Sequence, residues 1–287
     1  MSEPKGKPGA GRDVRDVLPA VLPAALRPPE GFVEAAAGVG VEFDTGDVEK
    51  LGAYLSLLLA ANETMNLTAL TEPSQMWRRH ILDSITLVGM LADLPEGSRV
   101  IDVGSGGGLP GIPLAICMPG LSFTLLEATG KKAAFLERAA GLLGLTNVRV
   151  VNDRAERAAH DRGERGARDR GMREVFDAVT ARAVGRLASL VELTAGFAKV
   201  GGRLLLIKGE QAEAEVAEAS EALHQLKVVH VETIETPTGR VVVLEKPSAT
   251  PRLYPRPNGE PTSKPLGGKV VRDRGVGDGG RRDGAAG

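Results

Sequence analysis

The spacing of apolar residues changes near residue 97 and divides the central part of the chain in two. Before this point, apolar residues recur every three or four positions, which predicts helices over 47–62 and 71–91. After it, short apolar runs alternate with stretches of helical periodicity. This alternation is typical of a mostly parallel sheet covered by helices on both faces. The strands are predicted over 99–103, 122–127, 148–152, 176–181 and 203–208. The helices between and after them are predicted over 110–118, 131–143, 186–197 and 211–223.

Two further apolar runs close the patterned region. Residues 227–234 and 240–244 flank Pro237, Thr238 and Gly239, which predicts an antiparallel hairpin at the sheet edge. The α/β domain therefore spans 97–247, and a helical extension over 31–96 precedes it.

The two ends of the chain and one internal stretch lack this periodicity. Residues 1–30 are rich in proline, and residues 248–287 are rich in glycine, proline and basic residues, so we expect both segments to be flexible. Residues 154–173 are rich in arginine and predict a solvated surface loop.

Composition limits the possible partners only weakly. The chain has 36 basic and 37 acidic residues, so any surface that binds nucleic acid must be a local one. The single cysteine, Cys117, excludes an intramolecular disulfide and is typical of a reducing compartment. The first residues lack the apolar run of a signal peptide, and no stretch is long and apolar enough to predict a membrane span. We therefore expect a cytoplasmic protein without a membrane partner, and a monomer by default.

The strongest chemical signal is the glycine-rich sequence VIDVGSGGGLPGIP over 100–113, directly after the first predicted strand. Glycines allow a sharp turn and let a ligand approach the backbone closely. Gly106, Gly108 and Gly111 fit the dinucleotide pattern G-x-G-x-x-G. However, this pattern begins two residues after the strand has ended, and Pro110 makes its helix start unusual.

A second pattern begins where the turn should begin. Asp102 is followed by Gly104, Gly106 and Gly108, which fits the acid-x-G-x-G-x-G pattern of motif I in methyltransferases. We therefore favour a methyl donor over a dinucleotide.

Side chains suited to a nucleoside follow the next predicted strands. Glu127 ends the second strand, where a carboxylate could accept hydrogen bonds from both ribose hydroxyls of either ligand. Ala155 and Glu156 follow the third strand and could offer an N–H and an acceptor to an adenine ring. Arg182 follows the fourth strand and could pair with a ligand carboxylate or an RNA phosphate.

Several motifs together resemble one family, the bacterial 16S ribosomal RNA guanine-N7 methyltransferases of the glucose-inhibited division protein B type. The resemblance covers about residues 45 to 266. The matching segments are 65–69 (MNLTA), 79–84 (RHILDS), 102–113, 135–136, 181–183 (ARA), 208–209 (KG) and 254–261 (YPRPNGEP). The chain departs from the family pattern in its N-terminal segment, its arginine-rich stretch and its tail beyond Leu266.

The resemblance implies a Rossmann-like, doubly wound class I methyltransferase sheet that binds S-adenosyl-L-methionine. Motif positions in the family imply donor contacts at Gly104, Leu109, Ala155, Glu156 and Arg182. We add Glu127 because a carboxylate at its position could bind a ribose. The resemblance further implies that the substrate is 16S ribosomal RNA or the small ribosomal subunit. Candidate RNA contacts are Arg78, Arg79, His80, Lys208, Arg252 and Arg256.

The implied reaction needs no general base, because guanine N7 carries an available lone pair in its neutral form. We therefore predict no catalytic acid or base and no metal ligand, and we interpret His80 as a packing or RNA-contacting residue. Two rival hypotheses stay open. A nicotinamide-dependent oxidoreductase would bind NADH and not the methyl donor, and a non-catalytic RNA-binding protein would bind RNA irrespective of the donor.

Overall fold

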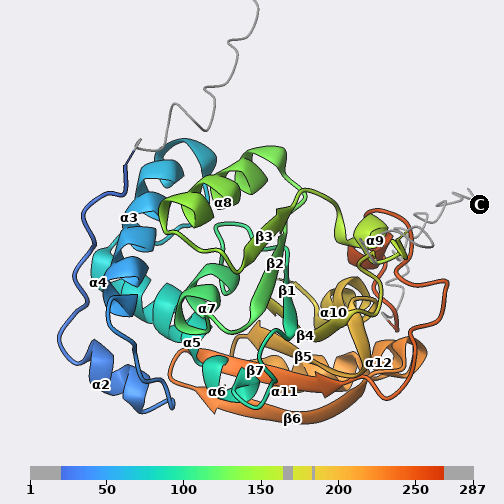
Figure 1. The fold of residues 1–287 in the computed structure, drawn as a ribbon. Helices are drawn as coiled ribbons and strands as arrows, with labels where there is room; N and C mark the ends of the chain where they lie inside the picture. The colour runs from blue at the N-terminus through green and yellow to red at the C-terminus, as the bar shows by residue number, and fades with distance from the viewer. Residues whose placement is uncertain (1–20, 164–170, 183–184, 268–287) are drawn as a thin grey trace, which may run out of the picture.

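The computed structural model describes residues 21–163, 171–182 and 185–267. Its centre is a seven-stranded sheet with the order β3-β2-β1-β4-β5-β7-β6 (Figure 1). The strands are β1 (Arg99–Val103), β2 (Ser122–Leu126), β3 (Val148–Val151), β4 (Phe176–Arg182), β5 (Ala198–Lys208), β6 (Val229–Thr236) and β7 (Gly239–Glu245).

Strands β1 to β5 are parallel, and the β6–β7 hairpin adds two antiparallel strands beside β5. This confirms the predicted doubly wound α/β class with an antiparallel hairpin. The chain leaves β1 in the centre of the sheet, where the strand order reverses between β2 and β4. In such sheets, ligands bind beyond the carboxyl ends of the strands at this reversal point.

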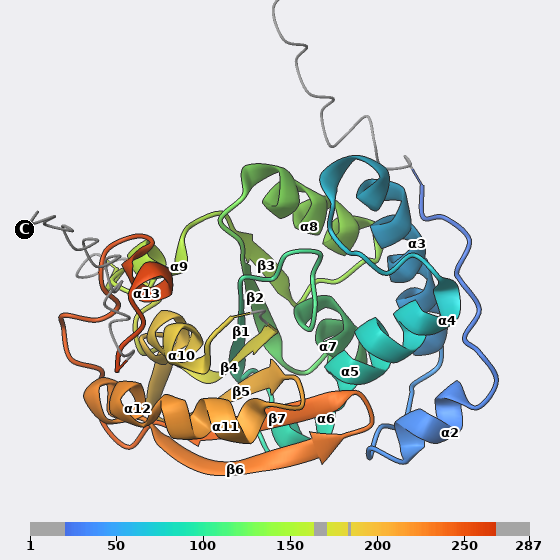
Figure 2. The same ribbon diagram turned by 180° about the vertical axis from the view of Figure 1, so that it is seen from behind.

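Helices cover both faces of the sheet (Figures 1 and 2). The N-terminal helices are α2 (Phe32–Ala37), α3 (Asp47–Met65), α4 (Pro73–Met76), the π-helix η1 (Trp77–Leu82), α5 (Asp83–Ile85) and α6 (Val88–Leu91). The others are α7 (Gly111–Cys117), α8 (Gly130–Leu142), α9 (Ala155–Ala158), α10 (Leu187–Ala195), α11 (Ala212–Glu218), α12 (Ser220–Leu226) and α13 (Glu260–Ser263).

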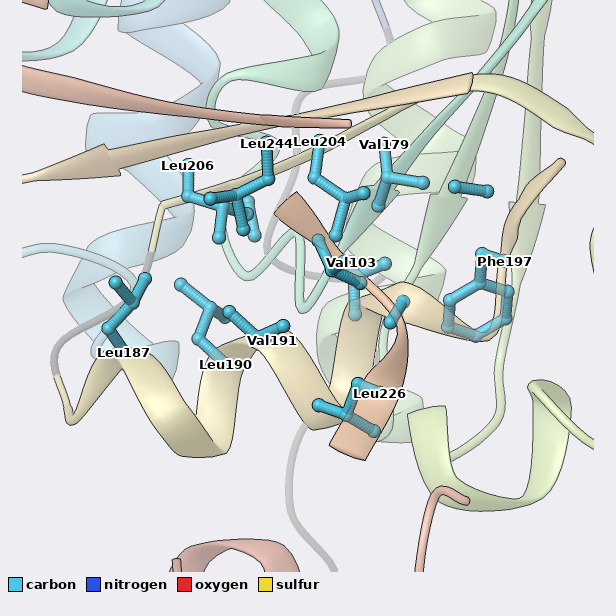
Figure 3. Close-up of a cluster of buried hydrophobic side chains, with 14 of the residues drawn as sticks. Val103, Val179, Leu187, Leu190, Val191, Phe197, Leu204, Leu206, Leu226 and Leu244 are labelled. Atoms are coloured by element: carbon cyan, nitrogen blue, oxygen red, sulfur yellow. The ribbon is translucent and has the colours of Figure 1, made fainter. Parts of the chain in front are cut away.

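Alternating side chains of the strands divide the core into two sides. Val100 of β1 packs with α6 and α7 on one face, and α3 and α8 extend this side. Ile101, the next residue, packs with α10 and α12 on the other face. Figure 3 shows this second core, in which Leu187, Leu190 and Val191 of α10 point toward the sheet. Both faces are covered, which explains why the central strands read as continuous apolar runs.

The helix predicted over 71–91 is divided into α4, the π-helix η1, α5 and α6, with a break between Ile85 and Val88. Glu72 caps α4 by accepting hydrogen bonds from the backbone N–H groups of Ser74 and Gln75, at 3.0 and 2.8 Å. The wider π-helical turn then buries Trp77 and His80 while Arg78 between them stays exposed.

The N-terminal expectation of a flexible segment over 1–30 is wrong for its last residues, while residues 1–20 lie outside the described part. Leu26 N–H donates to the Gly52 carbonyl at 3.1 Å, and Ser56 Oγ donates to the Ala24 carbonyl at 2.7 Å. A Cβ on Gly52 would lie 2.3 Å from the Leu26 carbonyl oxygen, so glycine permits this close approach.

The prediction that residues 248–287 are flexible is likewise wrong as far as Gly267, because this part of the segment packs against the fold. Tyr254 and Leu266 are buried against the α10 core. In the stretch 154–173, α9 forms at one end and Arg173 is buried at the other, whereas 164–170 lie outside the described residues. This stretch is therefore only partly a solvated loop.

Candidate functional site

The glycine-rich turn leaves the carboxyl end of β1 and crosses toward β2. Gly104, Gly106 and Gly108 have φ angles of 73°, 57° and 98°, a left-handed conformation that L side chains rarely adopt. The N–H groups of Gly104 and Ser105 both donate to the Leu126 carbonyl, at 2.9 and 3.1 Å. The turn is therefore fixed to the end of the neighbouring strand.

Asp102, the acid of the motif, lies beneath this turn and is fully buried. Its Oδ2 accepts from the Gly111 N–H at 3.2 Å, and its Oδ1 accepts from Thr180 Oγ1 at 3.3 Å. Burial raises the pKa of Asp102 to about 6. A Cβ on Gly111 would lie 2.2 Å from Leu125 Cδ2, so this glycine is required for packing. Asp102 thus supports the turn and the start of α7 from below.

Glu127 follows β2 and faces the turn. Its Oε2 accepts from the Gly106 N–H at 3.0 Å, and its Oε1 accepts from the Thr129 N–H at 2.7 Å. The Asn152 side chain donates to the Glu127 carbonyl at 2.8 Å and joins the ends of β2 and β3. The carboxylate predicted to bind a ribose is thus held beside the glycine turn.

Ala155 and Glu156 form the first turn of α9, after the end of β3. Glu156 is buried, and its Oε1 accepts from the N–H of Gly259 in the C-terminal segment, at 2.8 Å. The sequence did not predict this contact, because the two residues lie 103 positions apart.

Arg182 ends β4 and contacts the π-helix. Its Nη1 donates to the Arg79 carbonyl at 2.9 Å and lies 3.3 Å from Asp83 Oδ2. It also lies 3.4 Å from His80 Nδ1. A guanidinium can only donate, so Nδ1 accepts and Nε2 carries the proton, which faces Thr68 Oγ1 at 2.7 Å.

His80 is buried, and its pKa is lowered to about 4 by that burial and by the charge of Arg182. At neutral pH the imidazole is uncharged and occupied at both nitrogens, so it is suited to holding Arg182 in place.

The helical extension is joined to the site at two points. Tyr54 Oη of α3 donates to the Gly107 carbonyl in the glycine turn at 2.8 Å. Asp83 Oδ1 accepts from Thr238 Oγ1 at the tip of the β6–β7 hairpin at 2.6 Å, and Arg79 Nη1 donates to the Thr238 carbonyl at 3.1 Å. None of these joining roles for Tyr54, Asp83 or Thr238 was predicted, since each depends on a contact between distant segments.

The candidate RNA contacts separate into two groups. Arg78, Arg79 and Arg252 are exposed. Lys208 is buried, where its Nζ lies 2.9 Å from Glu215 Oε2, and Arg256 forms an ion pair with Glu192 at 2.6 Å. His80 is also buried, with partners at both ring nitrogens. Contrary to expectation, the side chains of His80, Lys208 and Arg256 are therefore engaged within the fold and do not face RNA.

A hollow of about 660 Å³ lies between the π-helix and the hairpin tip. Its charged lining combines Arg78, Arg79 and Arg240 with Glu210 and Glu235. Arg240 was not among the sequence candidates, because it lies inside a strand pattern and reaches this hollow only through the hairpin.

Two further observations concern the described residues alone. Over 21–163, 171–182 and 185–267, no three His, Cys, Asp or Glu side chains gather in a way that could hold a metal ion. No helix in these ranges has the length and apolarity needed to cross a membrane.

Comparisons with known proteins give the family. Residues 47–242 match the model of the GidB family, rRNA small subunit methyltransferase G. A ribosomal RNA small subunit methyltransferase G from Sorangium cellulosum is 50% identical over 85% of this chain and 98% of its own length. The Brevibacillus brevis enzyme of the same name is 40% identical over 83% and 98%. A SAM-dependent methyltransferase structure from Aquifex aeolicus aligns with a TM-score of 0.45 at 17% identity, over 62% of this chain and 95% of that one. The chain belongs to the GidB family of small subunit rRNA methyltransferases.

Proposed function

We propose that the protein transfers the methyl group of S-adenosylmethionine to N7 of a guanine in 16S ribosomal RNA. Methylation of small-subunit ribosomal RNA follows from family membership, and S-adenosylmethionine is the cofactor of this family. The choice of guanine N7 follows the family resemblance described above, and the contacts and the mechanism are our inference from the site.

The observation that carries the proposal is the open space at Gly104. This residue follows β1 directly, is exposed and has a φ of 73°, and a Cβ built on it would meet no atom within 4 Å. A Cβ at this position would therefore point into open space, and Gly106, two residues further on, donates its N–H to the Glu127 carboxylate. A ligand with a ribose fits this arrangement of an open glycine and a fixed acceptor.

The other donor contacts follow from the strand ends. We assign the Ala155 N–H and the Glu156 carboxylate to the adenine ring, and Arg182 to the donor's carboxylate. Leu109 belongs to the glycine-rich turn and is buried, and we assign it a donor contact on its position in the family motif.

When bound, S-adenosylmethionine supplies a methyl group on a sulfonium that a lone pair can attack. Guanine N7 has such a lone pair, so the residues of the site have no proton to remove before transfer. His80, with a pKa of about 4, positions Arg182 in this mechanism. The protein's contribution is alignment of the two reactants, worth at most about 7–11 kcal/mol, with electrostatic support for the positive charge as it moves from the sulfonium to the methylated guanine.

We assign the RNA to the hollow beside the hairpin tip. Arg78, Arg79 and Arg240 line it at the carboxyl side of the sheet, where Arg182 also lies. Arginine forks suit phosphate oxygens. Arg252 is a further exposed candidate on the C-terminal segment. Because the substrate is ribosomal RNA, a cytoplasmic location follows from the proposal, and we retain the monomer as the working assembly.

The test is methyl transfer from labelled S-adenosylmethionine to small ribosomal subunits that lack their native modification, with free 16S RNA and large subunits as controls. We expect label in small-subunit RNA and none in large subunits. Donor binding without any transfer would contradict the proposed substrate, and NADH binding in place of the donor would restore the oxidoreductase hypothesis.

A further inference from the structure

Arg173 joins the C-terminal segment to the end of α9. Its Nη1 donates to the Ala159 carbonyl at 2.8 Å and to the Tyr254 carbonyl at 3.0 Å, and its Nη2 donates to the Thr250 carbonyl at 2.9 Å. Arg173 is only 6% exposed. Buried polar groups need partners, so this guanidinium fixes the start of the segment against the fold.

Arg256 fixes the middle of the segment. Its Nε lies 2.9 Å from Glu192 Oε1, and its Nη2 lies 2.6 Å from Glu192 Oε2, which is the paired geometry of a strong arginine–carboxylate contact. Glu192 lies on α10 and is fully buried. The pairing raises the pKa of Arg256. Removal of the arginine would leave a buried carboxylate without its cation, so the segment depends on this pair.

On both sides of Arg256, the segment contacts α9 and the residues that follow it. The Gly259 N–H donates to Glu156 Oε1 at 2.8 Å, and His160 Nε2 lies 2.7 Å from the Pro255 carbonyl oxygen. Gly259 has a φ of 82°, a conformation that favours glycine. Glu156 is therefore held by the C-terminal segment at one carboxylate oxygen.

We propose that residues 254–261 complete the adenine side of the donor site, with Arg256 as a positioning residue. The segment fixes the Glu156 carboxylate through Gly259, so that Oε2 accepts from the exocyclic amine of the adenine. This inference rests on the proposed function, since it assigns adenine to Glu156. The inference assigns the family motif at residues 254–261 to recognition of the donor and not to contact with RNA.

The experiment compares two ligands by titration calorimetry with the full-length protein. S-adenosylhomocysteine carries the adenine amine, and S-inosylhomocysteine carries a carbonyl oxygen in its place. The variants are Arg256→Ala, Glu156→Ala and their combination. Lys264→Ala is the control, because Lys264 is an exposed cation just beyond residues 254–261.

We expect the unaltered protein to bind S-adenosylhomocysteine about tenfold or more tightly than S-inosylhomocysteine, because a hydrogen bond to a charged group typically strengthens binding by at least that factor. Arg256→Ala should lose most of this preference, and it should change affinity less than about twofold when Glu156 is already alanine. Such non-additivity marks two residues that act as one unit. Lys264→Ala should bind both ligands as the unaltered protein does.

The two claims fail in different ways. Failure of the unaltered protein to bind either ligand would overturn the proposed function. Binding without a preference would overturn the assignment of Glu156 to the adenine amine and, with it, the role of the segment. A preference that survives in Arg256→Ala, or additive effects of the two substitutions, would overturn only the role of the segment. Arg256→Lys covers the case in which the alanine variant does not fold, since it keeps the charge and loses the fork. It should show a reduced preference between the ligands.

Discussion

Replacement of Gly104 by alanine isolates the ligand-binding role of the glycine turn from its effect on stability. Gly104 and Gly97 flank the same strand, β1, at its two ends. Their φ angles are 73° and 78°, both are exposed, and a Cβ on either one would meet no atom within 4 Å. The two substitutions are therefore matched in backbone strain and in the absence of a clash.

The strain of an alanine in this conformation is about 1–2 kcal/mol in each variant. For a chain of this size, such a loss lowers Tm by a few degrees, with about 2–4 °C per kcal/mol. Only Gly104 lies at the carboxyl end of the sheet, beside Glu127. A methyl group there occupies the space assigned to the donor, so we expect S-adenosylmethionine to bind at least tenfold more weakly, a loss of about 1.4 kcal/mol or more.

The assay is calorimetric titration of S-adenosylmethionine into Gly104→Ala, Gly97→Ala and the unaltered protein, with thermal melts of all three. An equal decrease in Tm in both variants, with weaker donor binding in Gly104→Ala alone, would support a donor site at Gly104. Equal donor affinity in the two variants would refute the reasoning, because the open space at Gly104 would then have no connection to the ligand.

Three further predictions address the site's supports. Tyr54→Phe removes the hydrogen bond to the Gly107 carbonyl and should reduce the free energy of unfolding by about 1–3 kcal/mol in urea titrations; an unchanged midpoint would contradict this. The folded pKa of Asp102 is raised from 3.8 to about 6, so the folded state binds this proton more tightly and stability from it is lost as the pH rises through that window. Asparagine has no such proton to lose. The free energy of unfolding of Asp102→Asn, measured relative to that of the unaltered protein, should therefore rise by on the order of 3 kcal/mol between pH 4 and pH 7. Parallel plots of unfolding free energy against pH for the two proteins would contradict this. Arg78→Ala should raise KM for RNA and reduce its salt slope by about one with donor affinity unchanged, whereas an unaltered slope would place Arg78 outside the interface.

The sheet could be predicted from the sequence because each central strand is buried on both faces and contrasts with the amphipathic helices around it. β1 matches its expected bounds, and the hairpin forms around the expected turn. β5 begins earlier than expected, at Ala198, and its pairing with β4 is irregular between Ala198 and Arg203, a stretch that lacks an apolar run. The helix expected over 211–223 divides at Ala219, which no local signal marks.

In the candidate site, too, positions set by a local pattern could be predicted, and contacts between distant segments could not. Glu127 could be predicted because its position depends on the end of one strand, a local pattern. The partners of Arg182 and Glu156 come from the π-helix and the C-terminal segment, and contacts over such separations leave no periodic signal. Arg256 was assigned to RNA because a sequence shows its charge, and the structure shows that Glu192 already binds this charge.

The most direct test of the central claim is nucleoside analysis of the methylated product. Small ribosomal subunits lacking the native modification would be incubated with the protein and S-adenosylmethionine, and their 16S RNA would be digested and separated by liquid chromatography with mass spectrometry. The account predicts a new 7-methylguanosine peak that is absent without protein and strongly reduced with Gly104→Ala. A methylated nucleoside of any other kind, or no methylated nucleoside despite measurable donor binding, would contradict it.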